Sequence, residues 1–122
     1  MSWHQIKRDA ADIAFSEWVR RRDRACKRCR KPGTGDKGIG GLDASHWQSR
    51  GKEGTRFEPL NVDALCRSCH RYFGEHKTEH DAWQLEMKGQ KIIDQILIQA
   101  HTYHKKDRLA EKIYWRNKLK AL

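Results

Sequence analysis

Two pairs of closely spaced cysteines constrain this chain more than any other feature of its sequence. Cys26 and Cys29 form one CxxC pair, Cys66 and Cys69 form the other, and the chain contains four cysteines in all. Zinc binds four thiolates in a tetrahedron, and a two-residue spacer lets one tight turn supply two of them. The spacing therefore predicts a structural zinc site that brings the two distant CxxC pairs together.

Disulfide bonds and thiol redox chemistry are the alternative interpretations of these cysteines. Disulfides are disfavoured because no hydrophobic N-terminal segment suggests export to an oxidising compartment. A thioredoxin-type site uses one CxxC beside a βαβ pattern, and neither pair here has that pattern around it. We therefore expect a zinc ion without a catalytic role, because four protein ligands leave it no open position.

A metal staple suits a chain of 122 residues, because so short a chain buries little apolar surface. Hydrophobic residues make up 37% of the chain, and its mean hydropathy is −1.00. We predict a single α+β domain over residues 1–122, mostly helical. We expect its core at about residues 22–78, an N-terminal helix at about 4–24 and C-terminal helices at about 81–121. The longest apolar runs are far too short to cross a membrane, so we expect a cytoplasmic protein.

Local patterns place the expected elements within these bounds. Apolar residues recur at three- and four-residue intervals over residues 4–24, as on one face of a helix. Residues 42–47 and 62–65 are the candidate strands, separated by a stretch that begins as a polar loop. A helix is expected to follow from near Cys69 to about Lys77. These elements predict a hairpin followed by a helix.

The C-terminal part of the chain is predicted to be wholly helical. Asp81 is a candidate N-cap for a helix through Met87, with Gly89 as its stop. Asp107 is a candidate N-cap for the last helix. We interpret these helices as packing elements, and they are also the candidate surface for a homodimer.

Charge points to a polyanionic partner. The chain has 26 basic and 16 acidic residues, a formal net charge of +10 and a pI of about 9.7. Nucleic acid is the leading candidate partner, and an anionic membrane surface is the lesser one. Basic residues gather in residues 20–31 and 105–120. Each run is also compatible with a solvated helix face, but the first flanks a cysteine pair and is the better candidate for phosphate contact.

The segment between and around the cysteine pairs resembles a known family. It carries the runs Asp43-Ala-Ser-His46, Ser49-Arg50-Gly51, Arg56-Phe57, Asn61-Val62 and Cys66-Arg-Ser-Cys69-His70. Over residues 13–77 the chain is similar to the HNH endonucleases, and more narrowly to phage NinG/Rap-type recombination endonucleases and the endonuclease VII branch. The resemblance implies a ββα-metal core, in which a hairpin and a helix hold a catalytic metal.

The resemblance also implies a role for each residue that matches the family pattern. His46 would be the general base that activates water, and Asn61 would hold the loop that orients it. Asp43 and His70 would bind a catalytic Mg²⁺ or Mn²⁺. The candidate DNA-binding and charge-stabilising residues are Arg50, Arg71 and Lys77.

The chain departs from the family pattern at two positions. Ser45 stands directly before the base, where many members have a metal ligand, and Gly74 stands where many have a second histidine. Asp43 and His46 would also face opposite sides of a regular strand, since side chains alternate along it. We therefore expect a bend or bulge there, assisted by Gly40 and Gly41.

These features predict a metal-dependent HNH DNA endonuclease that nicks duplex or branched DNA, such as recombination intermediates in a phage or prophage setting. The main alternative is a non-catalytic, zinc-stabilised DNA-binding module in which the histidines are structural. A zinc-stapled protein-interaction module is the third hypothesis. A strong dependence of binding on salt would separate the DNA-binding hypotheses from the last one.

Overall fold

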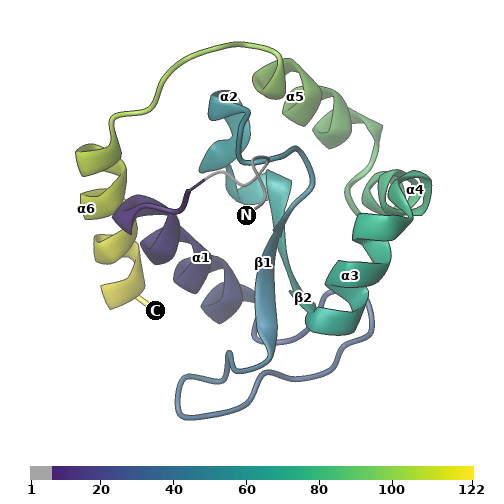
Figure 1. The fold of residues 1–122 in the computed structure, drawn as a ribbon, viewed down its shortest axis with the longest axis horizontal. Helices are drawn as coiled ribbons and strands as arrows, with labels where there is room; N and C mark the ends of the chain where they lie inside the picture. Colours follow the sequence, from purple (N-terminus) through teal and green to yellow (C-terminus); the bar gives the residue numbers. More distant parts are fainter. Residues whose placement is uncertain (1–6) are drawn as a thin grey trace.

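The computed structural model describes residues 7–122 of the chain and shows an α+β fold that is mostly helical (Figure 1). The predicted fold class is therefore confirmed at this level. The elements in chain order are α1 (Ala10–Asp23), β1 (Leu42–His46), α2 (Glu53–Arg56), the 3₁₀ helix η1 (Pro59–Asn61), β2 (Val62–Cys66), α3 (Arg67–Glu75), α4 (Lys77–Lys88), α5 (Gln90–Ala100) and α6 (Arg108–Lys120).

Strands β1 and β2 form a two-stranded antiparallel sheet at the centre of the molecule. The ladder is regular, since each residue of β1 pairs with one residue of β2, from Leu42 opposite Cys66 to His46 opposite Val62. Helices α1 and α3 both contact the sheet and lie on opposite sides of β1 (Figure 1). All five residues of β2 are buried, whereas β1 is only partly covered.

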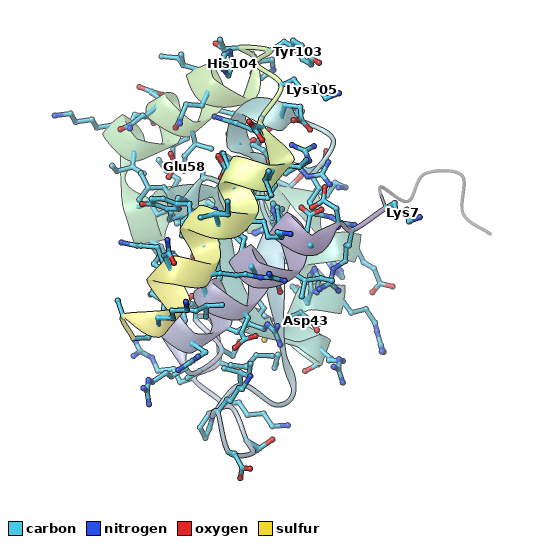
Figure 2. All side chains as sticks on the ribbon, turned by 90° about the vertical axis from the view of Figure 1, so that its left-hand side faces the viewer. Lys7, Asp43, Glu58, Tyr103, His104 and Lys105 are labelled. Carbon is cyan, nitrogen blue, oxygen red and sulfur yellow. The ribbon has the colours of Figure 1, made fainter. Side chains whose placement is uncertain are left out.

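One hydrophobic cluster joins the N-terminal helix to the C-terminal one. Phe15 and Val19 of α1 are buried together with Val62 and with Trp115 of α6. The rings of Phe15 and Trp115 have centroids 4.7 Å apart, and Figure 2 shows α6 lying alongside α1. Burying aromatic rings of this size supplies much of the stability of a small core. The last helix is thus part of the domain core.

A second hydrophobic cluster surrounds the cysteines where β2 leads into α3. It contains Leu65 and Phe73 together with three of the four cysteines, and Trp83 of α4 packs against it.

Within residues 7–122, no helix has both the length and the apolar character needed to cross a bilayer.

The first helix starts later than the sequence pattern predicted. Asp9 accepts a hydrogen bond from the Asp12 main-chain N–H at 3.0 Å, and Asp12 accepts one from the Asp9 N–H at 2.9 Å. This reciprocal capping box satisfies main-chain donors that the first turn of a helix leaves open. The helix therefore begins at Ala10, the prediction for residues 7–9 is wrong, and residues 4–6 lie outside the described part of the chain.

Of the three helix ends predicted in the C-terminal part of the chain, two are confirmed and one is wrong. Gly89, with φ of 84°, follows α4, and Asp107 caps α6 by accepting from the Ala110 N–H at 3.1 Å, so both predictions are confirmed. Asp81 is not an N-cap, because α4 already begins at Lys77 and Asp81 lies within it. Its carboxylate instead accepts from the indole N–H of Trp47 at 2.8 Å, a tertiary contact that residue spacing does not reveal.

The short helix α2 lies within a segment predicted to begin as a polar loop. A Cβ added to Gly54 would lie 1.9 Å from the main-chain oxygen of Gln99. The end of α5 therefore packs directly on the α2 backbone, and a residue without a side chain is needed there. This single turn depends on tertiary packing that sequence periodicity does not indicate.

Candidate functional site

The four cysteines form a cluster whose geometry fits a structural metal site of the zinc type. Their sulfur atoms all lie within 4.8 Å of one another, and Cys29 Sγ lies 3.7 Å from Cys66 Sγ. Disulfide sulfurs would be about 2 Å apart. Sulfurs in a zinc–thiolate tetrahedron with bonds of about 2.3 Å are separated by about 3.8 Å. The spacing prediction of a four-cysteine metal site is thus supported by the fold.

Local structure explains how the two pairs meet. Cys26 and Cys29 lie in the turns that follow α1, whereas Cys66 ends β2 and Cys69 lies in the first turns of α3. The main-chain N–H of Lys27 donates to a carbonyl of β2 at 2.9 Å, which ties the first turn to the sheet. The fold therefore brings both pairs to one end of the hairpin.

Neighbouring groups act in opposite directions on the thiols of this cluster, since burial raises the pKa of Cys69 to about 12 whereas hydrogen bonds lower that of Cys66. A hydrogen bond with the Ser68 hydroxyl is the main cause that lowers the pKa of Cys66 to about 6. Arg28 points its guanidinium at Cys69, with Nη1 3.6 Å from Sγ. A cation and hydrogen-bond donors around thiolates reduce the repulsion between their negative charges, which assists metal binding.

A separate cleft of about 620 Å³ is lined by four of the other predicted site residues, Asp43, His46, Arg50 and His70. Its lining comes from the edge of β1, one side of α1, the start of α3 and the loop after β1. The lining residues are Arg8, Asp12, Ser16, Arg20, Leu42, Asp43, Ala44, His46, Ser49, Arg50, Arg67 and His70.

His46 is held in this cleft in a defined protonation state. Its Nε2 lies 2.9 Å from the main-chain oxygen of Arg56. Because a carbonyl oxygen only accepts hydrogen bonds, Nε2 carries the proton and Nδ1 carries the lone pair. Burial lowers the pKa of His46 to about 4. The imidazole is therefore neutral at neutral pH and able to accept a proton at Nδ1.

Asp43 and His70 meet at the same cleft from different elements. Asp43 Oδ2 lies 3.1 Å from His70 Nδ1, and Arg67 approaches the other carboxylate oxygen at 3.5 Å. Both side chains remain accessible, with exposed fractions of 30% for Asp43 and 44% for His70. The fold thus brings together the two predicted ligands of the catalytic metal.

The bulge expected in β1 is not needed, and that prediction is wrong. The pairing of β1 with β2 is regular from residue 42 to residue 46, so Asp43 and His46 do point to opposite faces. Both nevertheless line the cleft, which takes its lining from β1, from α1 and from the start of α3. An edge strand exposes side chains of both faces to one groove.

Asn61 is fully buried and holds the loop that follows β1. Its Oδ1 accepts from the Gln48 N–H at 2.8 Å, and its Nδ2 donates to the Gln48 oxygen at 2.9 Å and to the Thr55 oxygen at 3.2 Å. Thr55 directly precedes Arg56, whose carbonyl meets His46. These bonds connect the segment after His46 to the segment that orients its ring.

An ion pair behind His46 was not predicted from the sequence. Arg56 donates from Nε and Nη2 to the two oxygens of Asp12, at 2.9 and 2.6 Å, and both side chains are buried. Burial raises the pKa of Asp12, but the hydrogen bonds and charge of Arg56 outweigh it and hold that pKa below its usual value. The two residues are far apart in the sequence, and no local pattern links them.

This ion pair continues towards the C-terminal helix. Glu53 approaches Arg56 at 3.5 Å and accepts from Arg108 Nη1 at 2.9 Å. The hydrogen bonds from Arg108 are the main cause that lowers the pKa of Glu53 to about 2. The segment that holds His46 is thereby connected to the start of α6.

The predicted basic residues have different positions. Arg50 lines the cleft, whereas Arg71 and Lys77 are exposed on α3 and at the start of α4, outside the cleft lining. Among the other lining arginines, Arg20 lies in the basic run 20–31 that was predicted for phosphate contact, whereas Arg8 and Arg67 were missed. The available signals were the position of Arg8 four residues before Asp12 and that of Arg67 directly after the third cysteine.

Comparisons of the chain with protein-family models, with curated proteins and with solved structures find no match. The resemblance to HNH endonucleases therefore rests on the sequence motifs alone.

Proposed function

We propose that this protein is a metal-dependent HNH DNA endonuclease that nicks duplex or branched DNA. One observation carries the proposal. The neutral His46, with its Nε2 proton held by a carbonyl, lines the same cleft as the Asp43–His70 pair. A base and a candidate metal site in one arginine-lined groove are the parts that phosphodiester hydrolysis needs.

The arrangement of β1, β2 and α3 supports a ββα-metal core. The two strands form the hairpin, and α3 begins directly after β2. The hairpin supplies Asp43 and His46, and the helix supplies His70. The four-cysteine site lies at the base of this unit, where it stabilises the position of α3 against the strands.

His46 is proposed to accept the proton of the attacking water at Nδ1. The carbonyl of Arg56 keeps accepting from Nε2, and so stabilises the imidazolium that forms. Asn61 maintains this orientation through its hydrogen bonds to the loop. Arg50 and Arg67, which line the cleft, are placed to bind a phosphate.

Asp43 and His70 have the donor chemistry for a divalent cation. Two ligands at right angles on an octahedral ion with bonds of about 2.1 Å lie about 3 Å apart, close to the 3.1 Å between Oδ2 and Nδ1. Mg²⁺ or Mn²⁺ bound there would stabilise negative charge on the phosphate and on the leaving oxygen. The exposure of both side chains leaves space for water ligands.

Nicking of supercoiled plasmid tests the proposal, with linear duplex and a four-way junction as further substrates. Wild-type protein should cleave DNA in Mg²⁺ or Mn²⁺ and lose activity when neither ion is added, and His46→Ala should be inactive with unchanged zinc content. His104→Ala is a matched control, because His104 lies in the exposed loop before α6 and far from Asp43 (Figure 2).

Two outcomes would contradict the proposal. Full activity of His46→Ala would exclude His46 as the base. DNA binding without cleavage of any of these substrates would instead support the non-catalytic DNA-binding module.

A further inference from the structure

The α1 side of the cleft carries positive charge that neither the proposed base nor the proposed metal site uses. We propose that Arg8 and Arg20 bind phosphates on the strand being cut, so that the cleft holds the backbone of one DNA strand at a time. This inference rests on the proposed function and specifies how its substrate is held.

The α1 side of the cleft is a stripe of residues four positions apart. Asp12, Ser16 and Arg20 of α1 line the cleft, as expected for residues that share one side of a helix, and Arg8, which precedes the helix, extends the lining. The helical part of the stripe, from Asp12 to Arg20, is about 12 Å long at about 1.5 Å per residue. Since one strand of B-DNA rises about 3.4 Å per nucleotide, this length corresponds to about three or four nucleotides.

The cleft has an excess of positive charge. Its lining contains four arginines and two aspartates. Asp12 is neutralised by the buried Arg56, and Asp43 is in contact with Arg67 and His70. The α1 stripe therefore presents a net positive wall. A wall of one sign lined by low-dielectric protein attracts a polyanion.

Arg20 is held in a position that suits phosphate binding. Its Nε donates to the Ser16 main-chain oxygen at 3.1 Å, which fixes the side chain against α1. A guanidinium has five N–H donors, and this bond uses one of them. Burial lowers the pKa of Arg20, the charges of Glu17 and Asp43 raise it, and the charge of Arg8 lowers it. The remaining N–H donors of Arg20 are able to bind a phosphate that enters the cleft.

The other arginines near Arg20 in the sequence have different contacts, so the proposed phosphate binding is specific to Arg20 within this run. Arg21 forms an ion pair within α1. Arg22 donates to two main-chain carbonyls near the start of β2, and Arg28 donates to a cysteine sulfur. Of the described residues that line the cleft, Arg20 is the one that comes from the basic run 20–31.

The size of the cleft favours a single strand. A volume of about 620 Å³ lies in the range of sites that enclose small ligands, about 300–1,000 Å³. Such a space accommodates part of one sugar–phosphate backbone and not the two strands of a duplex. A duplex would therefore present one of its strands to the cleft.

Binding of a short fluorescent DNA strand, alone and within a duplex, tests the inference in buffer without added Mg²⁺ or Mn²⁺, where the proposed cleavage does not occur and the structural zinc is retained. Affinity is measured over a salt series from about 50 to 200 mM, because each phosphate contact adds to the salt dependence. Arg20→Gln should weaken binding several-fold and reduce the slope of log K against log salt by about 1 on both probes. Arg8→Gln should act in the same direction.

Arg21→Gln is the matched control, because it removes the same charge from the neighbouring position of α1. It should change affinity and salt slope less than Arg20→Gln does. Equal effects of the two substitutions would overturn the inference, as would an Arg20 effect confined to the duplex probe. Arg8 is exposed and precedes α1, so Arg8→Gln provides the test if Arg20→Gln does not fold.

The two proposals fail in different ways. If the protein cleaves no DNA but Arg20→Gln still reduces the salt slope more than Arg21→Gln, the nuclease proposal fails and the phosphate site stands. If the protein cleaves DNA and both variants behave alike, the phosphate site fails and the nuclease proposal stands.

Discussion

The imidazole of His46 and the main-chain carbonyl of Arg56 are joined by a hydrogen bond of 2.9 Å that determines which ring nitrogen carries the proton. The Arg56 side chain points elsewhere and pairs with Asp12 on α1. One residue therefore orients the candidate base with its main chain and anchors the helix that forms the cleft wall with its side chain.

The pKa of His46 predicts how stability depends on pH. Because its pKa is about 4 in the folded protein and 6.5 in the reference state, the unfolded chain binds more protons between these values. Stability should therefore be lost as pH falls from 6.5 towards 4, by at most about 3 kcal/mol from this residue. Urea unfolding across this range measures the effect.

His46→Gln is the comparison for this measurement, because acid also protonates the zinc thiolates. The pH dependence attributable to His46 is the difference between wild type and variant. Identical pH dependence in the two proteins would show that His46 does not have the lowered pKa.

The Asp12–Arg56 pair predicts a large loss of stability on Asp12→Ala. Removing the carboxylate leaves a buried guanidinium without its main partner, which costs about 3–5 kcal/mol in comparable sites. Glu17→Ala is the control on the same helix, since the ion pairs of Glu17 with Arg21 and Lys37 are more exposed and are expected to contribute about 1 kcal/mol or less. A similar effect of both substitutions in urea unfolding would contradict the prediction.

Asn61 should matter both for stability and for the proposed reaction. Asn61→Ala removes three hydrogen bonds to buried main-chain groups and should cost about 1–3 kcal/mol. Asn61→Ala should also reduce nicking at temperatures where the variant is fully folded, because the loop after His46 loses the hydrogen bonds that hold it. Asn117→Ala, at an exposed position of α6, should leave both unfolding and nicking unchanged.

Zinc removal should unfold the region around α3. The four cysteines join the turn after α1 to β2 and α3, and bound structural zinc contributes directly to folding free energy. A strong zinc chelator should lower helical circular dichroism and broaden the thermal transition, and added zinc should restore both. Cys29→Ser should reproduce the loss, and a cooperative transition at the wild-type temperature would contradict this role.

Short-range features of the chain could be predicted from the sequence. The two CxxC pairs, the stop at Gly89 and the cap at Asp107 act through neighbouring residues. For this reason residue type and spacing were sufficient to predict them. The homodimer through the C-terminal helices and the phage or prophage setting stay predictions.

The candidate site was only partly accessible from the sequence. His46, Asp43 and His70 were selected by resemblance, but whether they share a groove depended on the position of β1 at the edge of the sheet. The regular pairing of β1 places Asp43 and His46 on opposite faces of the strand, which by itself argues against a common site. Both residues nevertheless line one cleft, whose other walls come from α1 and α3. The Asp12–Arg56 contact likewise exists only because the folded chain brings the first turn of α1 close to the last residue of α2.

The sequence by itself determined the four-cysteine site and the identities of the candidate base His46 and its neighbours, because these depend on residue type and local spacing. Only the tertiary structure decided which side chains share a cleft, which nitrogen of His46 is free to accept a proton, and which arginines line the α1 wall. Those properties depend on the packing of elements distant in the chain, and hydrophobic burial and paired charges between those elements determine that packing.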